Sequence, residues 1–490
     1  MSTKTNNSTQ TKFVDLWPVP SAPPFASSPT RVAGVNPEST QKLRDLLKLN
    51  HDNWHIFYDA VGRHDHMAHH LLALWSLGAD AKVLQDAYDV HVPLQSPVGG
   101  EQAERITKEN VFDHLGDRTY YKAYLVFFSE VVREKGGVAA VEEYVFSDWA
   151  NFGSKNVHGK HPEMLSRFIG GLLHSVIHVG YGVEFGLPGM FVEGLAQAAV
   201  TDDNSATVVP ESLFTVDGTN KSPGKEKNVH ALTILGRALK DNRLEVRRTG
   251  TVGTYTAPSA ACGAASVDHA GDWLLDMQPS PELVQRKIQE LEWAITIMCV
   301  LAGYEEGKEY NADFIAMHFV TSSLFLGSLV PSLTPRSQAL LLRAYFSLIL
   351  AVWAMLGKPE PDFGNFFGAP LEFEGPHYIP APTKFVLAPS TNPNPWLEIL
   401  QQAIVHPDDH LAKFQRAMYH YAVKYGSVHA GYFANTELAG SEKIDGSLFV
   451  RGAALAAQRI GREVEELPHA PHMTFWDRRS FQRDVTEEIY

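Results

Sequence analysis

The sequence predicts an all-α protein: a mostly helical, single large domain with long loops and at most minor β-structure. Apolar residues recur at helical spacing along most of the chain, whereas the alternating pattern of strands is scarce. No repeat of about 20 to 50 residues is visible, so a solenoid is not favoured. With 490 residues, of which 44% are hydrophobic, the chain is long enough to bury a large core without disulfides.

The predicted elements follow a polar leader. Residues 1–37 are rich in Ser, Thr, Asn and Pro, and we expect a flexible or extended leader before a helical domain at 38–490. Residues 243–266 are the best candidate for an irregular or β-like insertion, and Pro-rich loops at 358–371 and 375–396 interrupt the helical pattern. After the helical start of the domain, the spacing predicts helices at 66–77, 100–116, 120–134, 164–179, 190–200, 227–240, 281–303, 311–328, 336–356, 395–404, 408–424 and 447–461.

Charge and cysteine content exclude several classes of protein. The net charge of -14 argues against partners such as nucleic acid and anionic membrane surfaces. Cys262 and Cys299 form no CxxC motif, which argues against a disulfide scaffold or a thiolate zinc site and favours a reducing compartment; we expect a cytoplasmic protein. The N-terminus lacks the apolar core of a signal peptide, and no apolar run reaches about 18 residues, so residues 344–356 are predicted to form a buried helix rather than a membrane span.

Histidines are concentrated near the start of the domain. Six of the 22 fall between residues 51 and 70, and four of them open the stretch HDHMAHHLLALW at 64–75. In a helix, His66 shares a face with His69 or with His70, but the adjacent His69 and His70 point in different directions. Either pair gives one face on which two imidazoles meet.

A second histidine pair lies in the apolar segment GGLLHSVIHVGYGVEFGLPG. His174 and His178 are four residues apart, so both imidazoles lie on one helical face and can reach one metal ion. The pair lacks the internal Glu of HExxH, which argues against a zinc protease of that type. His318, in NADFIAMHFVTSSLFLG, is a candidate third imidazole. The alternative is that these are core histidines that bind nothing.

Neutral imidazoles leave the charge of a divalent metal ion uncompensated in a core, so an anionic ligand is expected. The candidates are Glu184, Asp313 and Lys413. A buried lysine loses its proton more easily, and its neutral amine can add carbon dioxide to become a carbamate with carboxylate oxygens. Spacing does not choose among the three.

Lys413 lies in the segment HPDDHLAKFQRAM. His410 is three residues before it, on the same helical face, and Asp408 or Asp409 is expected to start the helix by accepting free backbone N–H groups. The alternative is a solvated surface helix. Imidazole with oxygen ligands suits iron, zinc, copper or nickel. No GxGxxG follows a strand and no CxxCH occurs, so neither a Rossmann cofactor site nor haem attachment is indicated.

Five motifs, taken together and in order, resemble the questin oxidase-like family of fungal polyketide tailoring enzymes. They are LNHDNWHIFYDAVGRHDHMAHHLLALWSLGA, YDVHV, GLLHSVIHVGYGVEFGLPGMFVEGLAQAA, the segment around His318 and HPDDHLAKFQRA, and the resemblance extends from about residue 40 to 480. It implies a tailoring enzyme that opens an anthraquinone ring oxidatively; a relative is described as a Baeyer–Villiger-like oxidase.

The resemblance also implies a metal site, because a family member is similar to a non-haem iron dioxygenase with four histidines and a carboxylated lysine. The cofactors would be Fe(II) and the carbon dioxide bound to the lysine, whose carbamate would accept a hydrogen bond from Thr334. One histidine of the HDHMAHH segment is implied as a metal ligand. We take His69 for it, and the choice among His66, His69 and His70 stays open. The implied ligands are His69, His174, His178, His318 and Lys413.

The leading functional hypothesis is an iron(II) oxygenase that uses dioxygen to cleave a C–C bond in an anthraquinone-type aromatic polyketide. Residues that do not bind the metal could orient its ligands or transfer protons: His51, His55, His66 and His410. Trp54, Phe57 and Tyr181 are candidates to line an aromatic pocket. Three alternatives stay open: an NADPH-dependent Baeyer–Villiger-like oxidase, although the chain shows no NADPH site; a zinc hydrolase with the same ligands; and a helical scaffold without metal.

Overall fold

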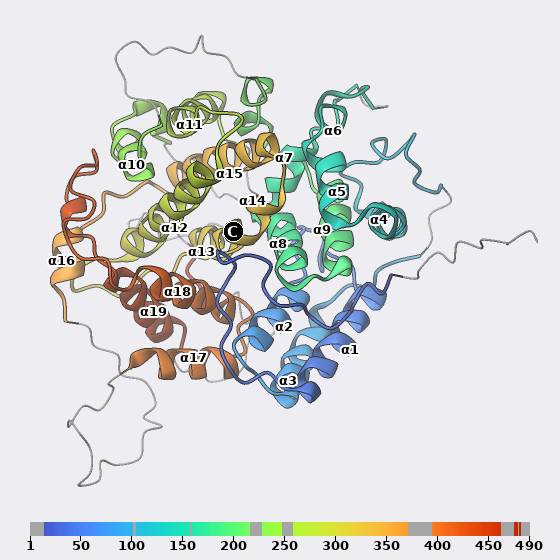
Figure 1. Cartoon of the computed structure of the whole chain (residues 1–490), viewed down its shortest axis with the longest axis horizontal. Helices are drawn as coiled ribbons and strands as arrows, with labels where there is room; N and C mark the ends of the chain where they lie inside the picture. The colour runs from blue at the N-terminus through green and yellow to red at the C-terminus, as the bar shows by residue number, and fades with distance from the viewer. Residues whose placement is uncertain are drawn as a thin grey trace, which may run out of the picture.

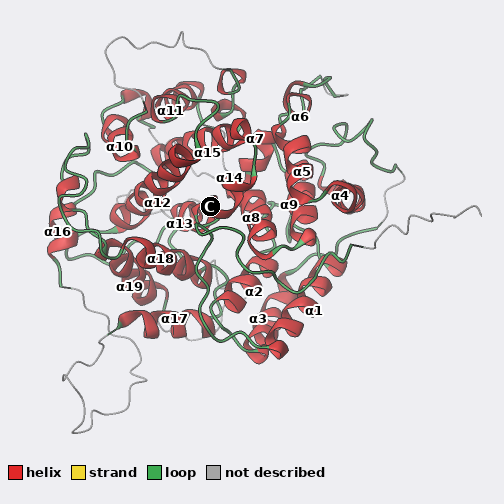
Figure 2. Cartoon of the chain, in the orientation of Figure 1, coloured by secondary structure: helices red, strands yellow, loops and turns green. Residues whose placement is uncertain are grey.

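The structure is a computed structural model, which describes residues 14–100, 104–156, 159–215, 228–246, 258–370, 394–461, 475–478 and 480–481. Helices account for its regular structure (Figures 1 and 2). Within the described ranges no strand occurs, and only three isolated β-bridges are found. The prediction of an all-α protein is therefore confirmed.

The helices form groups around a centre (Figure 1). One group is formed by the N-terminal helices α1 (Pro37–Asn53), α2 (Met67–Ser76) and α3 (Ala81–His91). The next consists of α4 (Tyr121–Lys135), α5 (Gly137–Val141), α6 (Asp148–Phe152), α7 (Met164–Ile169), α8 (His174–Phe185) and α9 (Pro188–Val200).

The second half of the chain completes the arrangement. A third group contains α10 (Ala231–Leu239), α11 (Ala260–Trp273), α12 (Pro281–Gly303) and α15 (Pro335–Met355). The fourth contains α16 (Phe363–Gly368), α17 (Pro395–Val405), α18 (Leu411–Tyr425) and α19 (Ser447–Ile460). The short helices α13 (Phe314–Ser323) and α14 (Leu326–Ser332) lie near the middle of the view in Figure 1.

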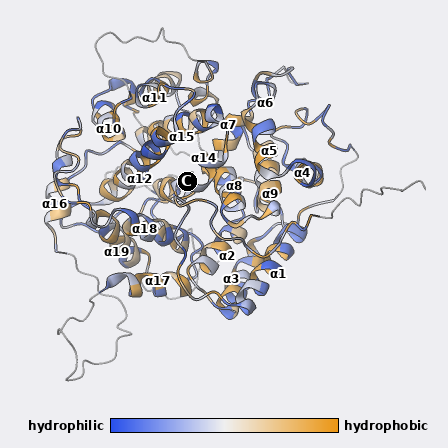
Figure 3. Ribbon diagram, viewed as in Figure 1, coloured by the Kyte–Doolittle hydropathy of each residue, from blue (hydrophilic) through white to orange (hydrophobic). Residues whose placement is uncertain are grey.

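Local chemistry explains where several helices begin. α1 starts at Pro37 because the side chains of Asn36 and Ser39 each accept the other's backbone N–H, a capping box. α12 starts at Pro281 after Ser280, whose hydroxyl accepts the N–H of Leu283. Burial of apolar residues then holds the helices together. In Figure 3, α8 and α9 are coloured mostly as hydrophobic, whereas α4 shows a hydrophilic side.

The predicted buried helix at 344–356 is confirmed as the second half of α15. Within the described part of the chain, α15 is the one straight helix long and apolar enough to span a bilayer, and α13 with α14 passes the same test only as a pair bent by 50°. However, 83% of the most apolar 18-residue window of α15 is buried inside the protein. Burial against other helices accounts for its apolar composition.

Three predicted segments need correction. Residues 104–116, within the helix predicted at 100–116, are not helical, and 108–116 form turns. The Asn110 side chain accepts the N–H of Thr107 and donates to the carbonyl of Arg105 in place of the helical ladder. Residues 260–266 of the expected β-like insertion begin α11; residues 247–257 lie outside the described ranges. The loop predicted at 358–371 contains α16.

The described part of the leader, residues 14–36, contacts the helical domain. Trp17 is 5% exposed and lies so close to Gly189 that a Cβ there would be 2.5 Å from the indole ring. The Arg31 guanidinium donates to the carbonyl of Glu184 over 3.0 Å, and the Thr30 N–H donates to His420 Nδ1 over 3.1 Å. Residues from three helices thus hold this segment on the core.

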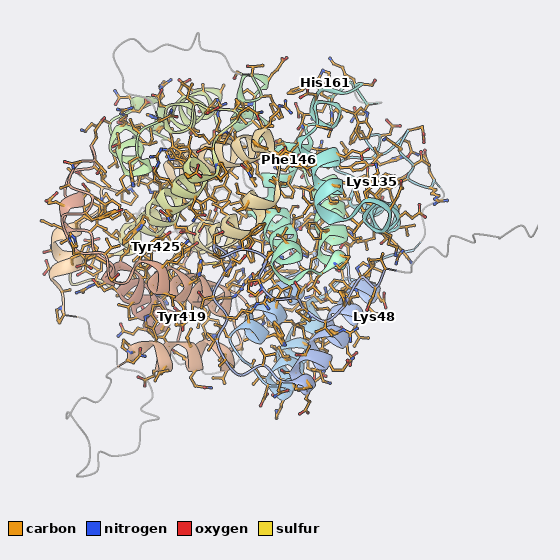
Figure 4. The ribbon with its side chains drawn as sticks, viewed as in Figure 1. Lys48, Lys135, Phe146, His161, Tyr419 and Tyr425 are labelled. Carbon is orange, nitrogen blue, oxygen red and sulfur yellow. The ribbon has the colours of Figure 1, made fainter. Side chains whose placement is uncertain are left out.

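The fold brings four helices together at its centre. α2 packs against α8 and α18, and α13 packs against the same two helices. These four helices come from different parts of the chain, and they carry the histidines that the sequence singles out. Figure 4 shows how side chains fill the space between the helices, while His161, a histidine outside this centre, lies at the periphery near α6.

Candidate metal centre

Four buried imidazoles meet at the centre of the protein. His66 precedes α2, His174 begins α8, His318 lies within α13 and His410 precedes α18; none is more than 6% exposed. Their rings form a closed circuit: the centroid separations are 4.8 Å for His66–His174, 5.0 Å for His174–His318, 5.1 Å for His318–His410 and 4.4 Å for His410–His66. We call these residues the four-histidine cluster.

Each imidazole of the four-histidine cluster has an oxygen beside its Nδ1 atom. The carbonyls of Gly171 and Phe314 lie 2.5 and 2.7 Å from Nδ1 of His174 and His318, respectively. The two carboxylate oxygens of Asp409 lie 2.7 Å from His66 Nδ1 and 2.8 Å from His410 Nδ1. These oxygens can accept hydrogen bonds, so the arrangement favours a proton on Nδ1 of His66, His174 and His318, while the His410–Asp409 contact is one of ion-pair distance.

Ring nitrogens of the four-histidine cluster approach one another. Nε2 of His66 is 2.7 Å from Nε2 of His174, and one nitrogen from each of His66, His318 and His410 lies within 4.8 Å of the others. His318 Nε2 is buried and has no hydrogen-bond partner among the described residues. Nitrogens that share one ion at the usual bond length of about 2 Å lie roughly 3 Å apart, so these residues fit a metal ion.

Lys413 lies beside the four-histidine cluster, one helical turn after His410. It is 4% exposed, and burial lowers the pKa of its amine to about 8, although the nearby carboxylates of Asp409 and Asp408 act in the opposite direction. Burial, followed by the positive charge of Lys413, also holds the pKa of His66 well below its usual value. The amine is therefore more readily neutral than that of an exposed lysine.

The acidic residues next to the cluster already have partners, which argues against a second ion site. One ligand atom each of Asp408, Asp409 and His410 also lies within 4.8 Å of the others. However, Asp408 Oδ1 already accepts the backbone N–H groups of His410 and Leu411 and the indole N–H of Trp476, at 3.0, 2.8 and 2.9 Å. Asp409 is occupied by the two imidazoles described above.

Two other predicted ligands, His69 and His178, form a hydrogen-bonded pair next to the four-histidine cluster. His69 Nε2 is 2.6 Å from His178 Nδ1, and the His69 ring lies 6.2 Å from that of His174. On its other side, His178 Nε2 is 3.4 Å from Glu193, whose second oxygen is 2.8 Å from Nδ1 of His51. A row of polar groups, His69, His178, Glu193 and His51, thus runs from the cluster to a partly exposed imidazole, with an ion-pair contact rather than a hydrogen bond between His178 and Glu193.

His55, predicted as a proton-transfer group, bonds to the backbone of a loop. Its Nδ1 accepts the N–H of Phe57 over 2.9 Å and its Nε2 donates to the carbonyl of Arg118 over 2.9 Å. Burial lowers the pKa of His55. Among the predicted pocket residues, Phe57 packs on His64 at 4.8 Å and the Tyr181 hydroxyl donates to the His69 carbonyl.

The other anionic candidates have partners of their own. Glu184 forms an ion pair with the fully buried Arg416, and Asp313 accepts the N–H groups of Ile315 and Ala316 at the start of α13. This leaves Lys413 as the candidate with the fewest competing bonds. Thr334, which precedes α15 and was predicted to donate to the carbamate, is exposed. Its hydroxyl donates to the Glu142 side chain instead.

The structure brings His174, His318 and Lys413 together as predicted neighbours and adds His66 and His410, which were predicted as catalytic groups. The sequence analysis did not predict a role at the site for three further residues. They are His64, Glu193 and Asp409, the last of which contacts two imidazoles. His64 stacks on His174 at 4.0 Å with a 7° interplanar angle. The position of Asp409, four residues before Lys413 and next to His410, was the available signal.

An unusual backbone sets the position of His174. The three residues before α8, from Gly171 to Leu173, all have positive φ, at 52°, 54° and 66°. A Cβ on Gly171 would also lie 3.0 Å from His64 Nε2. Left-handed non-glycine residues are costly and are concentrated at functional sites. The segment that orients His174 is therefore held by its surroundings.

We expect Gly171→Ala to destabilise the protein by about 1 to 2 kcal/mol, because alanine is strained at this φ and its methyl group contacts His64. Urea unfolding followed by circular dichroism measures the change. Gly368→Ala is the control, since Gly368 has no positive φ and no atom within 4 Å of its Cβ position. Equal stability of the two variants would contradict this account of the turn.

Comparison with known proteins identifies the chain. It is 29% identical to a Baeyer–Villiger oxidase of Emericella nidulans over 86% of this chain and 89% of the relative. It is also 29% identical to a questin oxidase of Aspergillus fumigatus, over 89% and 92%, and 26% identical to a questin oxidase of Aspergillus terreus, over 79% and 82%. The helical fold, the buried site and these relatives define an oxidoreductase.

The family model described as Questin oxidase-like matches residues 63–418. The matched region includes the whole four-histidine cluster and Lys413. The chain belongs to the Questin oxidase-like family.

Proposed function

We propose that this protein is a non-haem iron-dependent oxygenase that opens a ring of an anthraquinone-type aromatic polyketide. The observation that supports it most is the arrangement of the four-histidine cluster: an oxygen atom beside every Nδ1, ring nitrogens close to one another, and a buried lysine at its edge. The names of the relatives, questin oxidase and Baeyer–Villiger oxidase, support the substrate class and the insertion of oxygen beside a carbonyl.

The proposed ligands are the four-histidine cluster and Lys413 as a carbamate. The Lys413 amine would bond to the carbon of carbon dioxide and release one proton, giving an anion that offsets part of the metal charge in a buried site. This set differs from the set implied by the resemblance in one respect. His66 and His410 replace His69 and His178, because the latter two are hydrogen-bonded to each other and His178 also lies 3.4 Å from Glu193.

Ferrous iron bound here would supply the activation of dioxygen. The protein's own residues would do the rest. Burial of the cluster excludes water. Phe314 packs against His318 and His410 at 4.9 and 5.1 Å, so its ring offers an apolar surface at the site for a planar aromatic substrate. The row of polar groups from His69 to the partly exposed His51 is suited to proton transfer between the site and solvent.

A zinc hydrolase is the second candidate, because the same donor set suits zinc. An NADPH-dependent oxidase is the third candidate, and we propose a cytoplasmic location for the protein.

Metal content and oxygen dependence test the proposed function. We expect the purified protein to bind one iron per chain and to consume dioxygen with a hydroxylated anthraquinone, giving a ring-opened acid. Elemental analysis, an oxygen electrode and mass spectrometry of the product measure these outcomes. Without dioxygen, no ring-opened product should form. Product formed anaerobically would end the oxygenase proposal, and stoichiometric zinc with esterase or lactonase activity would favour the hydrolase.

A further inference from the structure

One carboxylate serves two members of the four-histidine cluster. Asp409 Oδ2 is 2.7 Å from His66 Nδ1, and Asp409 Oδ1 is 2.8 Å from His410 Nδ1. Asp409 is 3% exposed, so water competes little for these contacts. His66 precedes α2 and Asp409 precedes α18, which means that a single side chain joins two distant parts of the sequence at the site.

We propose that Asp409 is the positioning residue that fixes the tautomer of His66 and His410 together, so that both present a free Nε2 lone pair to the metal. The inference rests on the proposed function and adds a named role to that site. An ionised carboxylate can only accept hydrogen bonds, so it favours a proton on Nδ1 both of His66, which is hydrogen-bonded to Asp409, and of His410, whose Nδ1 lies at ion-pair distance from it. Main-chain carbonyls accept from Nδ1 of His174 and His318 in the same way. A main-chain carbonyl cannot be removed by substitution, whereas the carboxylate of Asp409 can.

Asp409→Asn tests whether the carboxylate is needed as an acceptor for two imidazoles or only as a buried side chain of this shape. An amide has the same shape but one accepting oxygen and one donating nitrogen. One of the two imidazoles would then face the NH₂ group, accept with Nδ1 and carry its proton on Nε2. That imidazole could no longer bind a metal, although neither histidine had been replaced. Loss of such an orienting partner weakens metal binding by about 10- to 100-fold.

Asp408 provides a matched control. It is adjacent to Asp409 and 0% exposed, and Asp408→Asn removes the same charge at the same depth. Its Oδ1 accepts from the N–H groups of His410, Leu411 and Trp476, and an asparagine oxygen can accept all three. The two variants therefore share the loss of charge and differ in whether an imidazole changes tautomer.

The experiment compares the full-length wild type with Asp409→Asn and Asp408→Asn. Anaerobic titration with Fe(II) gives the dissociation constant, and X-ray absorption counts the imidazole ligands. We expect Asp409→Asn to bind iron about 10- to 100-fold more weakly with one imidazole fewer, and Asp408→Asn to stay close to wild type in both. Equal affinity and equal ligand number in the two variants would overturn the inference.

A second measurement reads the tautomers directly in the metal-free wild type, where no metal ion imposes them. Histidine-selective ¹⁵N NMR reports which ring nitrogen carries the proton, with signals assigned by single His→Gln substitutions. We expect Nδ1–H for both His66 and His410; Nε2–H on either would overturn the inference. If the wild type binds iron and both Asn variants bind it equally well, the role of Asp409 is wrong but the proposed function stands. If the wild type binds no metal, the role of Asp409 and the proposed function are both wrong.

Discussion

Replacement of His318 by alanine is expected to abolish stoichiometric iron binding while the helical far-UV spectrum stays close to that of the wild type. His318 contributes a buried Nε2 without a partner, and its Nδ1 is fixed by the Phe314 carbonyl of its own helix. Removing the ring therefore takes away one ligand and leaves the helical backbone bonds in place. Elemental analysis after gel filtration measures the bound iron, and His174→Ala should behave in the same way.

His420→Ala is the matched control for these two variants. His420 is 2% exposed, as buried as His318 and His174, but its Nδ1 accepts the N–H of Thr30 far from the cluster on α18. We expect this variant to lose stability and keep its iron. Full iron occupancy in both His318→Ala and His174→Ala would mean that the four-histidine cluster is not the metal site.

Lys413→Arg is expected to lose ring-opening activity entirely. A guanidinium stays protonated and cannot form a carbamate, so the site would gain a buried positive charge in place of an anionic ligand. Activity assays with a hydroxylated anthraquinone measure the loss. A carbamate also has a direct signature: wild-type protein in ¹³C-bicarbonate should show one ¹³C signal in the carbamate region, which Lys413→Arg lacks.

Lys287→Arg controls for the removal of a buried lysine. Lys287 is 0% exposed, but its side-chain nitrogen donates to the Val229 carbonyl and pairs with Glu290 at 2.9 Å, so it already has partners of its own. We expect this variant to keep both activity and the ¹³C signal. A fully active Lys413→Arg protein would remove Lys413 from the site.

The sequence predicted helices best where spacing and caps agreed. The spacing at 281–303 corresponds to α12, whose start is fixed by Ser280 and Pro281, and the helix predicted at 66–77 corresponds to α2. It failed at 104–116, where apolar spacing is present but the Asn110 side chain takes the backbone bonds of a helix. A local polar competitor of this kind is invisible to a pattern of apolar residues.

The site was predictable as a set of segments rather than as a set of ligands. Spacing places His174 and His178 on one face of a helix, and the structure keeps them in the same helix, α8. Their partners nevertheless differ: His174 faces His66, whereas His178 faces His69 and Glu193. Which ring turns inward depends on the left-handed turn before α8 and on neighbours that are remote in sequence, and neither is encoded in the spacing.

The order in which the four-histidine cluster is synthesised has a consequence for how the enzyme matures. His66 leaves the ribosome early and Lys413 late, with the interval on the order of tens of seconds at usual translation rates. Under the proposed function, no nascent fragment that ends before Lys413 holds the complete set of donors, so iron would be bound only after this residue has been synthesised. Under the same proposal, cells starved of iron should accumulate an intact protein that binds iron when the metal is supplied.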